Sequence, residues 1–203
     1  AGGGSKLGSV IDGEDTGEHA RMSGSISNAG DGVDIGGRYS DDGSGNDDGG
    51  HVRIYEYSSG SDSWSQLGSD IDGEAGADRS GISVSMNSAG DRVAIGAYLN
   101  DGDSGNDAGH VRVYERDASN TTIAPFGWSQ LGSDIDGEAA GDESGWSVSM
   151  NSDGDRVAIG ARYNDDGPGN DGGHVRIYEY SSGSDSWTKL GSDIDGEEGY
   201  DFS

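Results

Sequence analysis

The stretch "SVSMNSDGDRVAIGARYNDDGPGNDGGHVRIYEY", residues 147–180, decides the fold of this chain. It holds three short runs rich in branched and aromatic side chains, at residues 147–151, 156–161 and 174–179. Turns of Asp, Asn, Ser and Gly separate these runs, which predicts short β-strands joined by tight connections. A fourth run, "WTKLG", begins at Trp187. No part of the chain shows the apolar period of a helix, so we expect almost no helix.

The same pattern recurs along the 203 residues. The anchor "LGS", followed by "IDGE", begins at Leu7, Leu67, Leu131 and Leu190, at spacings of 60, 64 and 59 residues. We therefore divide the chain into the tail of a preceding repeat (1–6), three repeats (7–66, 67–130 and 131–189) and the start of a fourth (190–203). The repeats differ most in one loop. Repeat two has "RDASNTTIAPFG" (116–127) where the other two have "YSSGSDS".

Four short strands per unit, at a period near 60 residues, predict a blade of a β-propeller. A single blade cannot bury both of its faces, so neighbouring units must stack. In "RVAIGA", we expect Val93 and Ile95 to point to one side, while Ala94 and Gly96 let the next blade approach closely. The predicted fold class is all-β, with blades of four short antiparallel strands. Because three blades do not close a ring, we expect a larger ring or array.

The ordered elements "SGWSVSMNSDGDRVAIGA" and "GHVRIYE" resemble the FG-GAP repeat family, the blade repeat of integrin α-chain propellers. The resemblance covers all three repeats and is closest to the short variants found in secreted proteins of marine microbes and algae. In that family, calcium-binding blades carry a long "D-x-D-x-D-G" loop between strands one and two. This chain has only "NSAGDR" or "NSDGDR" there. The calcium site of the family is therefore not carried over to these residues.

Repeat one departs from its copies at two strand positions. Gly24 replaces the valine of Val84 and Val148, and Asp34 replaces the alanine of Ala94. A carboxylate at a packed position is costly unless it is paired. We therefore expect either that repeat one lies at an exposed end or that Asp34 has a partner.

The charge of the chain restricts its partners. The chain has 39 acidic and 12 basic residues and a formal net charge of −27. Such a charge argues against nucleic acid or an anionic membrane as a partner. No apolar run reaches the roughly 20 residues of a membrane-spanning helix, so we expect no membrane insertion. There is no cysteine, no Gly-x-Ser-x-Gly motif and no phosphate-binding loop, and the carboxylates recur with each repeat. This pattern predicts a protein that is not an enzyme.

The acidic loops are candidate sites for Ca²⁺, because hard cations take carboxylate oxygen ligands. The alternative is that these residues only form turns, which Asp, Asn and Gly favour. The candidate ligands lie in "DIDGEAGAD" and "DIDGEAAGD" and are Asp70, Asp72, Glu74, Asp78, Asp134, Asp136, Glu138 and Asp142.

Two further features concern single residues. His51, His110 and His174 recur in "GHVR", and we expect each to share a strand face with the nearby Arg and to pair with acids. Asn120 begins the sequon "NTT" in the longest loop and is a candidate for N-glycosylation.

We interpret the chain as a secreted, extracellular repeat protein for adhesion or recognition. Alternatives are a structural subunit of an extracellular filament or matrix and a calcium-dependent lectin. The expected partners are a protein, a glycan or further copies that associate through the repeat faces.

Overall fold

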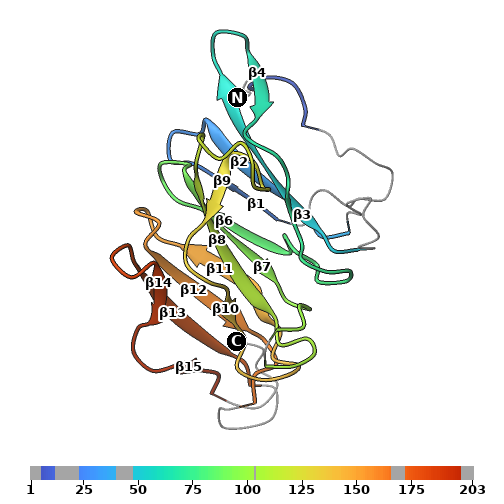
Figure 1. The fold of residues 1–203 in the computed structure, drawn as a ribbon, viewed down its shortest axis with the longest axis vertical. Coiled ribbons are helices and arrows are strands. Elements are labelled where there is room, and N and C mark those ends of the chain that lie inside the picture. The colour runs from blue at the N-terminus through green and yellow to red at the C-terminus, as the bar shows by residue number, and fades with distance from the viewer. Residues whose placement is uncertain (1–5, 12–22, 40–47, 103, 166–171, 198–203) are drawn as a thin grey trace, which may run out of the picture.

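Three antiparallel sheets follow one another along the long axis of the molecule, in chain order (Figure 1). This computed structural model describes residues 6–11, 23–39, 48–102, 104–165 and 172–197. All elements assigned within these ranges are strands, as the sequence predicts. None of the described residues forms a helix long and apolar enough to cross a membrane.

The three sheets are built alike. Sheet one contains β1 (Ser23–Ile26), β2 (Gly32–Gly37), β3 (His51–Ser58), β4 (Ser63–Gln66) and β5 (Ile71–Asp72). Sheet two contains β6 (Ser83–Met86), β7 (Arg92–Ala97), β8 (His110–Arg116), β9 (Trp128–Gln130) and β10 (Ile135–Asp136). Sheet three contains β11 (Ser144–Met150), β12 (Arg156–Ala161), β13 (His174–Ser181), β14 (Ser186–Lys189) and β15 (Ile194–Asp195).

The four predicted strands of each blade are confirmed, and a short fifth strand adds to them. In sheet one, the second half of β3 pairs with β4 and its first half pairs with β5, where Val52 lies opposite Ile71. The fifth strand comes from the Ile-Asp pair of the following repeat, which the sequence pattern alone suggested to be part of a turn. In sheets one and two its isoleucine inserts into the core, since Ile71 and Ile135 are only 1% and 5% exposed.

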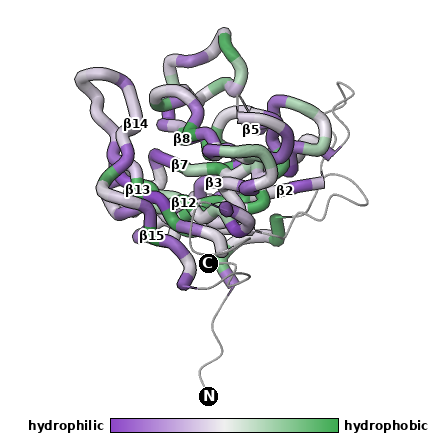
Figure 2. The backbone as a smooth tube through the Cα atoms, turned by 90° about the horizontal axis from the view of Figure 1, so that it is seen from below, coloured by the Kyte–Doolittle hydropathy of each residue, from purple (hydrophilic) through white to green (hydrophobic). Residues whose placement is uncertain are grey.

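The hydrophobic core lies between the sheets. Each sheet has a trailing face, turned to the next sheet along the chain, and a leading face, turned to the preceding one. Hydrophobic positions run along strands such as β7 and β12 (Figure 2). The cluster between sheets one and two joins Val52, Ile54 and Ile71 to Val84, Met86, Val93, Ile95, Tyr114 and Trp128. The cluster between sheets two and three joins Ala94, Val111, Val113, Leu131 and Ile135 to Val157 and Ile159.

Small residues let neighbouring sheets approach closely, as predicted for Gly96. A Cβ atom on Gly96 would lie 2.1 Å from the carbonyl oxygen of Gly145 in the next sheet. Beside it, the Ser83 hydroxyl donates a hydrogen bond of 2.8 Å to the same oxygen. The equivalent contact between sheets one and two repeats both features, with Gly36 and Ser23 against Gly81.

Tryptophans join the sheets at their outer edge. The indole N–H of Trp128 donates to the carbonyl of Leu67 at 2.9 Å, and that of Trp187 donates to Leu131 at 2.8 Å. Trp128 is only 1% exposed, so it fills the outer part of the interface as well as bonding across it.

Asp34 lies fully buried, so repeat one does not expose it. One carboxylate oxygen accepts a hydrogen bond from the backbone N–H of Ser25. Its other oxygen has no hydrogen-bond partner among the described residues. Burial raises the pKa of Asp34 to about 6, against the opposing effect of the backbone N–H groups of Ser25 and Asp34. The sequence left a partner for Asp34 as one alternative without identifying it, and the structure shows that this partner is the backbone N–H of Ser25. This hydrogen bond offsets only part of the cost of burying the carboxylate.

We predict that Asp34→Ala stabilises the protein at neutral pH and much less in acid. The pKa of Asp34 is higher in the folded state, so this carboxyl destabilises the fold as pH rises from about 4 to 6 and leaves it unaffected below. The pKa difference from 3.8 to about 6 corresponds to a gain on the order of 3 kcal/mol at pH 7. Urea unfolding of both proteins at about pH 4 and pH 7 measures it. A gain of equal size at both pH values would contradict the role of the charge.

We also predict that Gly96→Ala destabilises the protein by about 3 kcal/mol or more, because its methyl group meets a backbone carbonyl that cannot move independently of its sheet. Gly60→Ala is the matched control, since a Cβ there meets nothing closer than the Ser58 hydroxyl at 3.9 Å. Its effect should stay within about 0.5 kcal/mol. Thermal or urea unfolding compares the two, and equal costs would show that sheet spacing is not set by Gly96.

Candidate functional site

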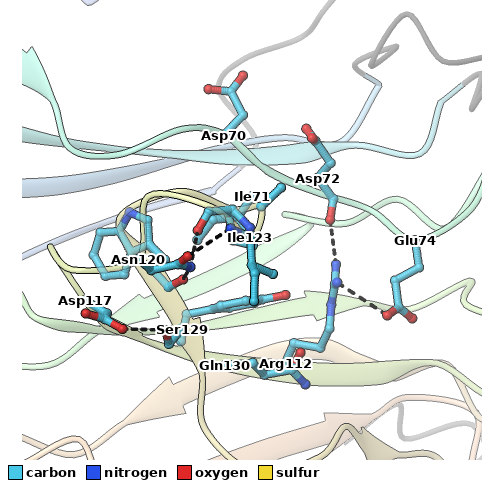
Figure 3. Close-up of a pocket in the computed structure, with 14 residues that line it drawn as sticks. Asp70, Ile71, Asp72, Glu74, Arg112, Asp117, Asn120, Ile123, Ser129 and Gln130 are labelled. Atoms are coloured by element: carbon cyan, nitrogen blue, oxygen red, sulfur yellow. Dashed lines mark hydrogen bonds and ion pairs between the residues drawn. The ribbon is translucent and has the colours of Figure 1, made fainter.

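A cavity of about 600 Å³ opens between sheets one and two (Figure 3). We call it the loop cavity, because the loop of residues 116–127 that is longer in repeat two forms one wall. Its volume lies within the range of small-ligand sites. The lining residues are Asp70, Ile71, Asp72, Glu74, Arg112, Tyr114, Asp117, Asn120, Ile123, Ala124, Pro125, Trp128, Ser129 and Gln130.

Asn120 holds the long loop in shape. Its side-chain amide N–H groups donate to the carbonyls of Pro125 at 3.2 Å and Trp128 at 2.7 Å. Its amide oxygen accepts from the backbone N–H of Ile123 at 3.1 Å. All three polar functions of the side chain are thus used to fold the loop back over the cavity. Glycosylation of Asn120 stays a prediction, and a glycan would have to replace one of the two N–H donors.

Asp117 fixes the base of the same loop. It accepts hydrogen bonds from the Ser129 hydroxyl at 2.9 Å and from Ser119. These hydrogen bonds lower the pKa of Asp117, so it is ionised at neutral pH. Repeats one and three lack this arrangement. There, Tyr57 and Tyr180 donate to Asp62 and Asp185 and close a short hairpin instead.

Arg112 is the one cation among the residues that line the loop cavity, beside four carboxylates. Its guanidinium donates to the backbone carbonyl of Asp72 at 2.7 Å and lies 3.5 Å from the Glu74 carboxylate. Both contacts bind it to the segment that enters from sheet one, as Figure 3 shows. Burial raises the pKa of Glu74, and Arg112 opposes that rise. Because Arg112 is already engaged, the cavity presents a net negative charge to a ligand.

The insertion loop contributes apolar residues to the loop cavity. Ile123 is 72% exposed although it lines the cavity, and Ala124 and Pro125 continue the same wall. Tyr114 and Trp128 also line the cavity, but both are almost completely buried. The cavity therefore combines the carboxylates of Asp70, Asp72 and Glu74, on the segment from sheet one, with an exposed hydrophobic side chain on the insertion loop.

The predicted calcium ligands do not gather within one loop. Asp134 and Glu74, from successive repeats, both approach His110, each with a carboxylate oxygen 3.9 Å from its Nδ1 atom. The same grouping recurs as Glu138, His174 and Asp193, and a third group holds His51, Asp70 and Asp72. Asp136 lies in β10, where it pairs with His110 through the backbone.

The remaining two predicted ligands stabilise turns. Asp78 accepts hydrogen bonds from the Ala75 backbone at 2.9 Å and from Asn100 at 3.0 Å. Asp142 makes the same contacts with Ala139 and Asn164, each at 3.0 Å. These are the turn roles that the sequence left as the alternative to metal binding.

His110 is a neutral ligand candidate. Burial, and secondarily the charge of Arg112, lower the pKa of His110 to about 4, while Asp134 opposes the change. The contacts with Glu74 and Asp134 are therefore not ion pairs at neutral pH. The expectation that the strand face pairs with acids is confirmed for Arg112 with Glu74 and for Arg176, which lies 3.1 Å from Glu138, whereas His110 lies beside its two acids without an ion pair.

These clusters suit Ca²⁺ poorly. Ca²⁺ takes six to eight oxygen ligands, whereas each of the two equivalent clusters offers two carboxylates, one imidazole and an adjacent guanidinium. The loop cavity could not be found from the repeat pattern, because the pattern marks what the units share. The signal that pointed to it was the single long insertion, residues 116–127.

Several solved structures align with this chain, and one of them, with a TM-score above 0.5, supports the fold. A protein from Bacteroides uniformis, provisionally named a 6-phosphogluconolactonase, aligns with a TM-score of 0.52 and 12% identity over 85% of this chain and 40% of its own. Hydrazine synthase of Kuenenia stuttgartiensis aligns with a TM-score of 0.46 and 10% identity over 96% of this chain and 42% of its own. The chain thus spans about two fifths of the length of these structures. No curated protein sequence matches it significantly.

The family comparison agrees with the sheets described above. Residues 134–178 match the FG-GAP repeat family. This segment runs from the end of repeat two's sheet through β11 and β12 into β13, and repeats one and two fold into the same five-stranded unit. Residues 134–178 therefore match one FG-GAP repeat, and the three sheets have the architecture of β-propeller blades.

Proposed function

We propose that the chain is a non-enzymatic, extracellular recognition protein that binds a partner in the loop cavity. The observation that carries this proposal is that the cavity occurs where one repeat differs from the others. Turns, ion pairs and inter-sheet contacts recur from repeat to repeat and serve the fold. The insertion 116–127 occurs once, and it is folded by Asn120 so that Ile123 lines the cavity.

The chemistry of the cavity favours a cationic partner with an apolar portion. Four carboxylates face one cation that is already paired, and the whole chain has a net charge of −27. A lysine or arginine side chain on a partner protein would place its charge at Asp70 and Asp72 and its methylene groups against Ile123. Charge complementarity would also raise the association rate. We therefore propose a protein with an exposed basic segment as the partner.

The two alternatives have weaker support. A calcium-dependent lectin requires a calcium site, and the carboxylate clusters include histidine and arginine rather than oxygen ligands alone. A filament subunit requires repeat faces that associate, and that property is compatible with recognition in the loop cavity.

We predict that replacing residues 116–127 with "YSSGSDS", the loop of repeats one and three, abolishes partner binding and preserves the fold. The short loop closes a β3–β4 hairpin in sheet one, so sheet two can accept it. A peptide array with Lys- and Arg-rich, acidic and neutral sequences measures binding, and circular dichroism checks the fold. Basic peptides should bind the parent about tenfold more tightly than the loop variant.

Two further variants complete that experiment. Ile123→Ser should weaken binding without changing the charge, and Asp62→Asn, in the short loop of repeat one, should leave binding unchanged. Equal binding of acidic and basic peptides, or full binding by the loop variant, would contradict the proposed function. Retention only on a glycan array in the presence of Ca²⁺ would favour the lectin alternative.

We predict that Ca²⁺ and Na⁺ raise the melting temperature equally at matched ionic strength. Salt screens the mutual repulsion of the acidic residues, whose range is about 8 Å at physiological ionic strength. Differential scanning calorimetry compares CaCl₂ with NaCl, and Asp134→Asn is the test variant. An additional stabilisation by Ca²⁺ that Asp134→Asn removes would show a specific site at Glu74, His110 and Asp134.

A further inference from the structure

We infer that two copies of this chain associate head-to-tail, with the leading face of sheet one in one copy against the trailing face of sheet three in the other. This inference is independent of the loop cavity. The two faces lie at opposite ends of the row of sheets (Figure 1). The two internal interfaces of the chain show what kind of surface covers each of them.

The trailing face of sheet three carries apolar residues that the other two sheets bury. In sheet one, Val52 and Ile54 are 0% exposed and Ile71 is 1% exposed beneath sheet two. Their counterparts in sheet two, Val111, Val113 and Ile135, are 0%, 1% and 5% exposed beneath sheet three. The equivalent residues of sheet three are only partly buried at Val175 and Ile177, and Ile194 is 57% exposed.

The leading face of sheet one also carries apolar residues that are less buried than their counterparts in the other two sheets. Val93 and Ile95 are 0% and 1% exposed against sheet one, and Val157 and Ile159 are 0% and 2% exposed against sheet two. Their counterparts in sheet one, Val33 and Ile35, are only partly buried. Ile26 is 61% exposed, whereas Met86 at the same position is 6% exposed.

Sheet three also carries the serine and glycine that make the polar contacts of the two internal interfaces. Ser23 and Ser83 donate their hydroxyl hydrogens to carbonyls of the following sheet at 2.6 and 2.8 Å. Ser147 and Gly160 retain the same serine and glycine on sheet three, where a Cβ on Gly160 would meet only Ser147 of its own sheet. Sheet three therefore presents the surface that receives a following sheet of this kind.

A second copy supplies such a sheet, because sheet one has the matching uncovered leading face. A head-to-tail contact is heterologous, and it produces either a closed ring or an open filament. Propellers close with about four to eight blades. The described residues of each copy form three sheets, so two copies of this 203-residue chain bring together six sheets, a number within this range, with two identical contacts.

Sedimentation equilibrium of the 203-residue chain tests the inference at about 0.15 M and 0.5 M NaCl. We expect a species of twice the chain mass of 20.8 kDa, whose dissociation constant falls as salt screens the charge of −27 on each copy. A chain that stays monomeric at both salt concentrations overturns the association. An open-ended series of larger species overturns the ring.

Two variants and one control test the surfaces. Ile194→Asn and Ile26→Asn should each weaken dimerisation about tenfold or more, because each contact loses a buried apolar side chain. Both residues are exposed in the single chain, at 57% and 61%, so its fold should be unaffected. Ile123→Asn, at a residue that is 72% exposed on the insertion loop, should leave dimerisation unchanged.

Comparing the two variants distinguishes head-to-tail association from a symmetric contact between identical faces. A head-to-tail contact uses one leading and one trailing face, so Ile26→Asn and Ile194→Asn should weaken dimerisation alike, whereas a symmetric contact responds to only one of them. If Ile26→Asn dimerises like the parent while Ile194→Asn does not, the contact joins two trailing faces and the inference is wrong.

Discussion

The close approach of one sheet to the next is the constraint on which the rest of this structure depends. With a Cβ position 2.1 Å from a neighbouring carbonyl, only glycine fits at Gly36 and Gly96. The serine hydroxyls that bond those carbonyls then fix the offset between the sheets. The valine and isoleucine side chains can bury completely only at this spacing, so a chain that is 30% hydrophobic still forms two continuous core layers.

This constraint also explains where variation is tolerated. Inner strands and their turns carry the inter-sheet contacts, so the repeats hold nearly identical sequences there. The outer hairpin between strands three and four contacts the neighbouring sheet through its tryptophan, as with Trp128 and Leu67, and through its loop, where Phe126 and Ser69 exchange hydrogen bonds. An insertion beside that tryptophan changes the surface without changing the spacing, which is why the loop cavity can be added to one repeat alone.

Much of the fold could be predicted because the sequence pattern of each strand recurs in three repeats. The bounds of strand two, Arg92–Ala97 and Arg156–Ala161, and the packing role of Gly96 are confirmed. The pairing of Ile71 with Val52 could not be predicted, since two residues carry too little periodicity to indicate a strand. The grouping of acids around His110 depends on the equivalent pairing of β10 with β8, which brings Asp134 of the next repeat beside His110 and Glu74.

Because of the fifth strand, the boundaries of a sequence repeat do not coincide with the boundaries of a sheet. Each sheet ends with two residues that the repeat pattern assigns to the next unit, such as Ile71 and Asp72 of β5. Unfolding one repeat would therefore remove a strand from its predecessor as well as a packing surface. Coupling between repeats then runs through shared backbone hydrogen bonds in addition to side-chain contacts, which makes unfolding more cooperative than stacking alone would.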